Sequence, residues 1–267
     1  MMTTDLTGYN SSRLIIDAER GLAQEEFFFL FQPKLRSEEG RISGFECLMR
    51  WQHPVDGVLE PSAFISVVAD SELTIRFTDF LLAHAMDTLA NWTARGYTNL
   101  SLAINLPAIE IVREDLPNKL IAGLACRDLD ASRLQIELTE AAEPAELDSF
   151  AAAIDVVRGT GVCVALDDFG AGLTSLTLLH QLPVDIIKIG RSFIDGVPNN
   201  TEARFIVETL IRLGQRLGKQ IVLKGIETEA QLTWARTLPF IDCQGFYISA
   251  PIPEYRIDHL IALHGQI

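Results

Sequence analysis

Six short apolar runs in this chain each end in polar residues whose types suit metal and proton chemistry. Amide and carboxylate groups end three of them, at Asn105, at Glu137, and at Asp167 with Asp168. Lysine or glutamine ends the other three, at Lys188, Lys224 and Gln244. Oxygen ligands select Mg²⁺ or Mn²⁺ over zinc, and a lysine can neutralise charge that develops on a phosphoryl oxygen. The pattern predicts metal-dependent chemistry on a phosphodiester.

The Asp167-Asp168 pair also has a simpler interpretation. Asp168 could instead cap the turn or helix that follows it, and a lone Asp-Asp pair would be interpreted that way. The surrounding pattern favours a ligand role, because Glu46, Asn105 and Glu137 end other predicted strands. Four strands would then bring oxygen ligands to one mouth, as the strand ends of a parallel barrel do.

The elements that must position these residues alternate between strands and helices. Residues 27–35 and 44–51 are strand-like, and the link between them is too short for a parallel crossover, so we expect them to pair antiparallel. A helical stretch near 62–96 follows, and then apolar strands alternate with helices. Eight strands in all predict an α/β fold, a modified TIM-type (β/α)8 barrel with an antiparallel first strand. We expect residues 1–20 to be an N-terminal lead-in and residues 21–267 to form one barrel domain.

Composition limits the class of partner. The chain has 267 residues and a formal net charge of -14, which argues against binding a nucleic-acid polymer or an anionic membrane surface. A small anionic ligand held through metal ions remains compatible. The N-terminus has no signal-peptide pattern and no 18 apolar residues run together, so we predict a cytoplasmic protein. The four cysteines show no CxxC spacing and predict buried free thiols rather than zinc or disulfides.

Eight longer motifs occur in order between residues of about 20 and 255. They read FQPKL, FECLMRWQHP, AINLP, IELTE, DDFGAGLTSL, IIKIG, LKGIETEAQL and CQGFYISAP. In these motifs the chain resembles the EAL domains, bacterial phosphodiesterases that hydrolyse cyclic di-GMP to the linear dinucleotide. The resemblance implies a barrel with an antiparallel first strand, divalent-metal dependence, and a homodimer formed around the loop after DDFG.

The resemblance also implies a role for each matched residue. The implied metal ligands are Glu46, Asn105, Glu137 and Asp167, with Asp168 beside the second metal. Lys188 corresponds to the catalytic lysine, and Gln244 to the glutamine that helps hold the attacking water. Gln32 and Arg50 match positions that contact the ligand, and Glu140 matches the anchor of the loop after DDFG. Asp168, Glu140 and Glu227 complete the expected ligand-binding set.

One departure from the family pattern decides the functional question. The first glutamate of the family's A-E-G-V-E-T motif is a metal ligand and the proposed general base, and here Lys224 takes its place, with Gly225, Glu227 and Thr228 in register. The exchange removes the base and shifts the local charge by two units, and one unit charge about 4 Å from another is worth roughly 4 kcal/mol at an effective dielectric near 20. We expect one Mg²⁺ or Mn²⁺ site, with a second disfavoured. We also expect Leu223, where the family has alanine, to crowd a carboxylate placed at position 224.

Three functions are compatible with this departure. The predicted one is a receptor that binds cyclic di-GMP with little or no hydrolysis. The first alternative is a working phosphodiesterase with an altered second metal site, and the second is a regulator that has lost the nucleotide and acts on a protein partner. A further alternative concerns Lys224 alone: its side chain would swing into solvent while Glu227 serves as the base.

Overall fold

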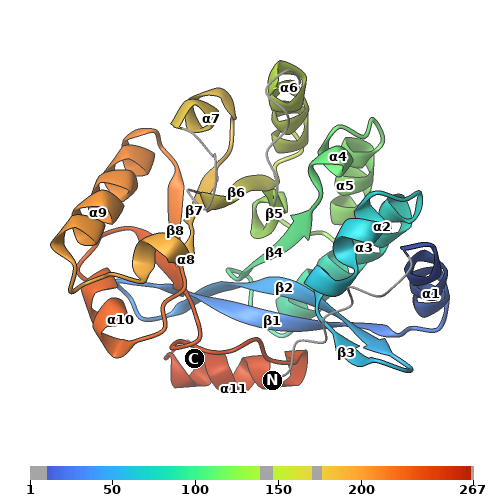
Figure 1. Cartoon of the computed structure of the whole chain (residues 1–267), viewed down its shortest axis with the longest axis horizontal. Coiled ribbons are helices and arrows are strands. Elements are labelled where there is room, and N and C mark those ends of the chain that lie inside the picture. The colour runs from blue at the N-terminus through green and yellow to red at the C-terminus, as the bar shows by residue number, and fades with distance from the viewer. Residues whose placement is uncertain (1–10, 139–146, 170–175, 266–267) are drawn as a thin grey trace.

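A closed ring of eight strands forms the centre of the molecule in the computed structural model, which describes residues 11–138, 147–169 and 176–265 (Figure 1). The ring consists of β1 (Phe27–Arg36), β2 (Ile42–His53), β4 (Ser101–Leu106), β5 (Leu134–Leu138), β6 (Cys163–Phe169), β7 (Ile186–Ile189), β8 (Gln220–Lys224) and β9 (Ile241–Gln244). Strand β1 is antiparallel to both of its neighbours, β2 and β9, and the other ring pairs are parallel. The predicted barrel with an antiparallel first strand is confirmed.

The antiparallel start follows from the short link between the first two strands. Only residues 37–41 join β1 to β2, and Gly40 takes a positive φ of 67° in this turn. The hairpin aligns Gln32 with Glu46, which places both side chains at the same level of the barrel. A short strand, β3 (Gly57–Leu59), pairs antiparallel with the far end of β2.

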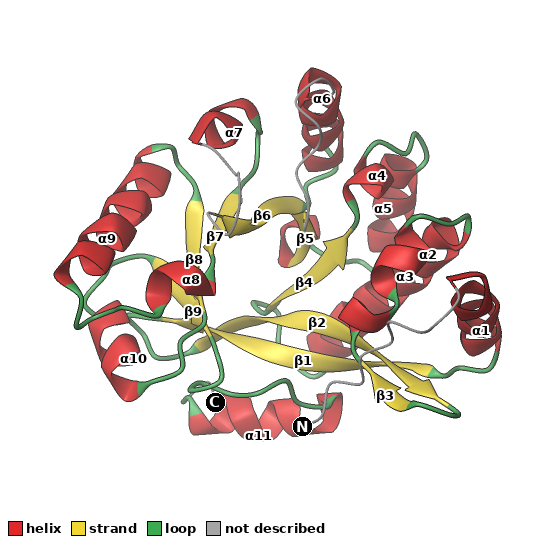
Figure 2. Cartoon of the chain, in the orientation of Figure 1, coloured by secondary structure: helices red, strands yellow, loops and turns green. Residues whose placement is uncertain are grey.

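Helices surround the strands, as Figure 2 shows in red around yellow. They are α1 (Ser11–Ala23), α2 (Ile65–Ala69), α3 (Leu73–Ala94), α4 (Ala108–Ile111), α5 (Leu116–Ala125), α6 (Leu147–Arg158), α7 (Leu176–Gln181), α8 (Arg191–Ile194), α9 (Thr201–Arg216), α10 (Glu229–Ala235) and α11 (Ile257–Leu263). Helix α1 buries Leu14 and Ala18 against the core, so the second half of the expected lead-in packs on the barrel. Among the described helices, none combines the length and the apolar character that a membrane span needs.

The helical stretch expected near 62–96 consists of a 3₁₀ turn (Pro61–Ala63), α2 and α3. Between α2 and α3 the Ser71 hydroxyl donates to the Val68 carbonyl and accepts from the Leu73 amide. The expectation about the cysteines is wrong in part. All four cysteines are free, but Cys126 is exposed at the end of α5, whereas Cys47 and Cys243 are buried.

Strict alternation along the strands separates an outer core from the barrel interior. Leu166, Ile187 and Leu223 face outward into the large apolar core beneath the helices. Their neighbours Ala165, Ile186 and Val222 form a small separate apolar cluster inside the ring. The next inward-facing position on each of these three strands, two residues further on, is Asp167, Lys188 or Lys224. The interior therefore carries an apolar layer directly below a charged one.

Candidate active site and ligand-binding site

Every strand of the ring contributes one polar side chain to the charged layer. These are Gln32, Glu46, Asn105, Glu137, Asp167, Lys188, Lys224 and Gln244, from β1, β2, β4, β5, β6, β7, β8 and β9 in that order. The register aligns Asn105 with Glu137 and Lys224 with Gln244. On six of the seven parallel strands these residues lie at or near the carboxyl end, which is where enzymes with this fold place their chemistry. Glu46 instead lies in the first half of β2, next to Cys47, where the pairing of β2 with β4 ends, so the expectation that Glu46 ends its strand is wrong.

Lys188 forms the buried centre of this layer. Its Nζ lies 2.8 Å from Glu46 Oε2, 2.6 Å from Glu137 Oε2 and 3.7 Å from Asp167 Oδ1, and its side chain is 1% exposed. One ammonium group therefore links four strands of the ring. Because water is excluded here, the charges interact more strongly than they would on the surface.

Glu46 is held from two further directions. Asn105 Nδ2 donates to Glu46 Oε1 at 2.9 Å, and Gln244 Nε2 donates to Glu46 Oε2 at 2.8 Å. Gln244 Nε2 also donates to Gln32 Oε1 at 3.0 Å. The Oε1 atom of Gln244 is buried without a hydrogen-bond partner among the described residues. A buried acceptor of this kind needs a hydrogen-bond donor, so a water molecule or a ligand group is expected to bind at this atom.

An irregularity in β6 directs two consecutive carboxylates to the mouth. The pairing of β6 with β7 shifts register between Leu166 and Phe169, and Asp168 has a positive φ of 44°. Such a backbone conformation is costly for a residue other than glycine and recurs at functional sites. It allows Asp167 and Asp168 both to reach the same ammonium group, where regular alternation would point them to opposite faces.

That ammonium group belongs to Lys224. Its Nζ lies 2.8 Å from Asp167 Oδ1, 2.9 Å from Asp167 Oδ2 and 3.1 Å from Asp168 Oδ1. The alternative in which Lys224 swings into solvent and Glu227 replaces it does not match this arrangement. Glu227 instead pairs with Arg191, with Oε1 2.6 Å from the nearest guanidinium nitrogen.

The electrostatics of the layer follow from burial and from the two lysines. Burial raises the pKa of Glu137 to about 7, and the neighbouring Glu46 carboxylate adds to this effect. Burial also opposes ionisation of Glu46, but Lys188 and Lys224 outweigh it and hold the pKa of Glu46 well below its ordinary value. For Lys188, burial acts to lower the pKa, and the surrounding carboxylates more than compensate and raise it. The pKa of Lys224 is raised as well, so both lysines of the layer stay charged.

The donor set suits a hard cation in part. Carboxylate and amide oxygens from Glu46, Asn105 and Glu137 are the ligands that Mg²⁺ and Mn²⁺ prefer. Within the described part of the chain, however, no three histidine, cysteine, aspartate or glutamate side chains are arranged as a metal-holding group. The reason is visible in the contacts above, since ammonium groups lie between the carboxylates. Asp167 and Asp168 in particular already share the ammonium group of Lys224.

A cavity of about 280 Å³ opens above the layer. It is lined by Gln32, Asp168, Arg191, Lys224, Gly225, Glu227, Gln244, Gly245 and Phe246. Phe246 is 63% exposed, so an aromatic face is available beside the charged groups. Arg50 lies on β2 beyond Glu46, and its guanidinium is 4.0 Å from Glu60 rather than in the hydrogen-bonded layer. Glu140 lies outside the described residues.

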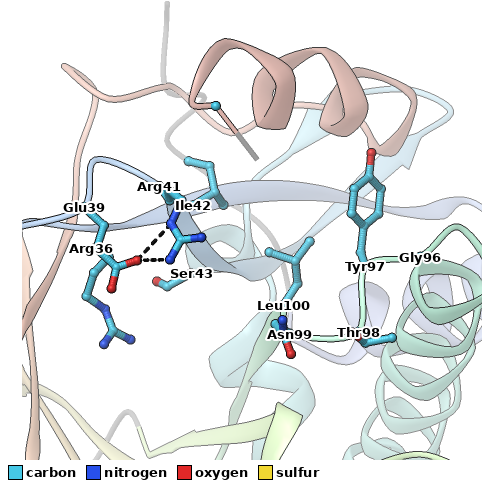
Figure 3. A pocket seen from close by; sticks show the side chains of 11 residues that line it. Arg36, Glu39, Arg41, Ile42, Ser43, Gly96, Tyr97, Thr98, Asn99 and Leu100 are labelled. Carbon is cyan, nitrogen blue, oxygen red and sulfur yellow. Dashed lines mark hydrogen bonds and ion pairs between the residues drawn. The ribbon is translucent and has the colours of Figure 1, made fainter. Parts of the chain in front are cut away.

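A second cavity, of about 460 Å³, lies at the opposite end of the barrel (Figure 3). It is lined by the end of β1, the start of β2 and the segment before β4, including Arg36, Arg41, Tyr97 and Leu100. Arg41 donates to Glu39 across its rim, and Arg36 pairs with Asp242 at 2.6 Å. No group of carboxylates like that around Lys188 and Lys224 lines it, so the candidate site is the one at the carboxyl ends.

Two further polar residues in or near the site were not singled out from the sequence. Lys34, on β1, is 2% exposed and donates to Gln135 one layer below the site. Arg191 begins α8 directly after β7 and lines the cavity above Lys224. The signal for Arg191 was its place just after the IIKIG run, where a strand end delivers the next residue to the mouth.

Comparison with known proteins places this architecture in a family. Residues 16–251 match the family model described as the EAL domain, and the chain belongs to that family. It is 30% identical over 245 residues to the bifunctional diguanylate cyclase/cyclic di-GMP phosphodiesterase MucR of Pseudomonas aeruginosa, covering 92% of this chain and 36% of MucR. It is also 30% identical over 245 residues to the cyclic di-GMP phosphodiesterase NbdA of the same organism, covering 92% of this chain and 31% of NbdA. The chain thus spans about a third of the length of these relatives.

The fold agrees with a solved relative. The structure of the PaMucR phosphodiesterase in complex with c-di-GMP superposes with a TM-score of 0.83 at 29% identity, covering 92% of this chain and 99% of that one. EAL-domain phosphodiesterases depend in general on divalent metal ions.

Proposed function

We propose that this chain binds cyclic di-GMP at the carboxyl mouth of its barrel and hydrolyses it little or not at all. Family membership and the cyclic di-GMP phosphodiesterases among its relatives support the choice of ligand. The proposed lack of hydrolysis rests on the position of Lys224, whose ammonium group contacts Asp167 and Asp168. A charged ammonium has no free lone pair to accept a proton from water, so it cannot act as the general base expected at this position.

The remaining residues keep roles in binding. Glu46, Asn105 and Glu137 would hold one Mg²⁺ or Mn²⁺ ion, and Lys188 would neutralise charge on a phosphate oxygen. Gln32 and Arg50 would contact the phosphates and backbone of the ligand. A cytoplasmic location and a homodimer stay predictions, and residues 170–175 of the loop on which the dimer depends lie outside the described residues.

A working phosphodiesterase is the second candidate. The unpartnered Oε1 atom of Gln244 favours it, because an acceptor held beside Glu46 and Lys188 can orient a water molecule. Quantifying the linear dinucleotide formed by the wild type in Mg²⁺ and in Mn²⁺ separates the two candidates. Turnover at background level supports the receptor, and sustained turnover supports the enzyme.

Arg50→Ala is expected to weaken the binding of cyclic di-GMP by at least about tenfold, because a charge-assisted contact to phosphate is worth on the order of 1.5–3 kcal/mol. Calorimetric titration in Ca²⁺ measures the change in dissociation constant. Arg76→Ala is the matched control, since Arg76 is an exposed arginine of α3 that pairs with Glu19 outside the site. An Arg50 variant that binds like the wild type would contradict the assigned role. No wild-type binding at high micromolar ligand would favour the protein-interaction function instead.

A further inference from the structure

We propose that the Lys224 ammonium group is a tethered substitute for a second divalent cation, so that the site receives a phosphate of cyclic di-GMP without a second metal ion. The inference rests on the proposed function for the identity of the ligand, whereas its statement about metal ions can be tested without any nucleotide.

The first support is the geometry of the ammonium group. Three carboxylate oxygens lie within 3.1 Å of Lys224 Nζ, two from Asp167 and one from Asp168. Both Asp167 oxygens accept hydrogen bonds from this ammonium group, and Asp168 forms an ion pair with it. The positive φ of Asp168 and the register shift in β6 bring both aspartates to this one cation. Here two adjacent carboxylates contact one positive charge, which is the arrangement that a bound divalent ion would otherwise produce.

The second support is the charge of the layer. With all carboxylates ionised, four of them (Glu46, Glu137, Asp167 and Asp168) and two ammonium groups (Lys188 and Lys224) leave a net charge of -2. A glutamate at position 224 would make five carboxylates and one ammonium, which leaves -4. The difference equals the charge of one divalent cation. The protein with Lys224 can therefore be neutralised by a single such ion.

The third support is access to the cavity. The Lys224 side chain is 21% exposed and lines the cavity, whereas Lys188 is 1% exposed. Arg191, which also lines the cavity, is held by Glu227. Of the two lysines in the layer, Lys224 is the more accessible to a phosphate in the cavity. Its contact with the half-exposed Asp168, at 3.1 Å, is the one that a phosphate oxygen can replace.

Titration of Mn²⁺ alone tests the statement about metal ions. By calorimetry, Lys224→Glu is expected to take up one more Mn²⁺ per chain than the wild type. Arg204→Glu, which reverses an exposed charge on α9, should leave the stoichiometry unchanged. Equal Mn²⁺ stoichiometry in the wild type and in a folded Lys224→Glu variant would overturn the proposal. If that variant does not fold, Lys224→Gln gives the same comparison, because loss of a nearby like charge should tighten Mn²⁺ binding by at least about tenfold.

Titration of cyclic di-GMP with one equivalent of Mn²⁺ per chain, and again with excess Mn²⁺, tests the statement about the ligand. The wild-type dissociation constant should agree within about twofold between the two conditions, while Lys224→Gln should bind at least about tenfold more weakly than the wild type with one equivalent. Wild-type binding that requires more than one Mn²⁺ per chain would overturn the tethered-cation proposal and leave the receptor function standing. No wild-type binding in either condition would overturn the receptor function itself, and the Mn²⁺ stoichiometry would still decide what Lys224 replaces.

Discussion

Lys224→Glu is expected to raise Mg²⁺- or Mn²⁺-dependent hydrolysis of cyclic di-GMP by at least about 100-fold over the wild type, which is the lower end of what a positioned general base contributes. The substitution removes the ammonium from Asp167 and Asp168 and supplies a carboxylate that can accept a proton from water. The surrounding groups need no further change, because Lys188, Gln244 and Glu46 already contact one another. Chromatographic measurement of the linear dinucleotide gives the rates.

Lys224→Gln is the matched control for this experiment. Glutamine has nearly the shape of glutamate but offers no base, so this variant should stay within a few fold of the wild type. Leu223→Ala should not be combined with the exchange. Leu223 is fully buried in the outer core and faces away from the mouth, so it does not crowd position 224 as the sequence suggested. Its truncation would cost about 2–5 kcal/mol of stability. Fast wild-type turnover that is lost in Lys224→Glu would contradict the account.

Lys188→Met is expected to lower the free energy of unfolding by about 3–5 kcal/mol at pH 8.5 with a chelator present, because it leaves Glu46 and Glu137 buried without their shared cation. The loss should be smaller at pH 5.5. Burial already raises the pKa of Glu137 to about 7 in the wild type, and removal of Lys188 raises it further. A carboxyl group whose pKa is raised by folding favours the folded state below its unfolded pKa, and this contribution is lost as pH rises through the folded pKa.

Denaturant titration at the two pH values measures this effect. Lys119→Met serves as the control, since Lys119 pairs with Asp79 and Asp115 on the surface, where such pairs are worth about 0–1 kcal/mol. A Lys188→Met loss no larger than that of the control would mean that the buried ammonium does not hold the layer together. An equal loss at both pH values would exclude Glu137 as the group that responds.

Much of the fold could be predicted from short-range features. The link between the first two strands was too short for a crossover, which fixed their antiparallel pairing, and apolar runs alternating with helical segments gave the rest of the ring. The helical stretch near 62–96 was predicted, but its division into a 3₁₀ turn, α2 and α3 was not, because hydrophobic spacing alone does not register the local bonds of the Ser71 hydroxyl.

The site was predictable where chemistry follows from position in a strand. Asn105, Glu137 and Gln244 come together because parallel strands end at one edge, and the pairing of β2 with β4 brings Glu46 beside them. The contacts of Lys224 with Asp167 and Asp168 were not predictable from the sequence. They depend on a backbone irregularity at these two aspartates that no residue pattern indicates. Lys34 was missed for a related reason: a lysine within a strand reads as solvent-facing until the closed barrel surrounds it.

One measurement on the wild type tests the central claim most directly. Cyclic di-GMP is titrated into the protein in Mn²⁺ by calorimetry, and the linear dinucleotide is quantified in the same samples over the duration of the titration. The account predicts saturable binding with product at the level of a protein-free control. Product formation that consumes the bound nucleotide during the titration would show that Lys224 belongs to a working catalytic site, and it would contradict the receptor function proposed for this chain.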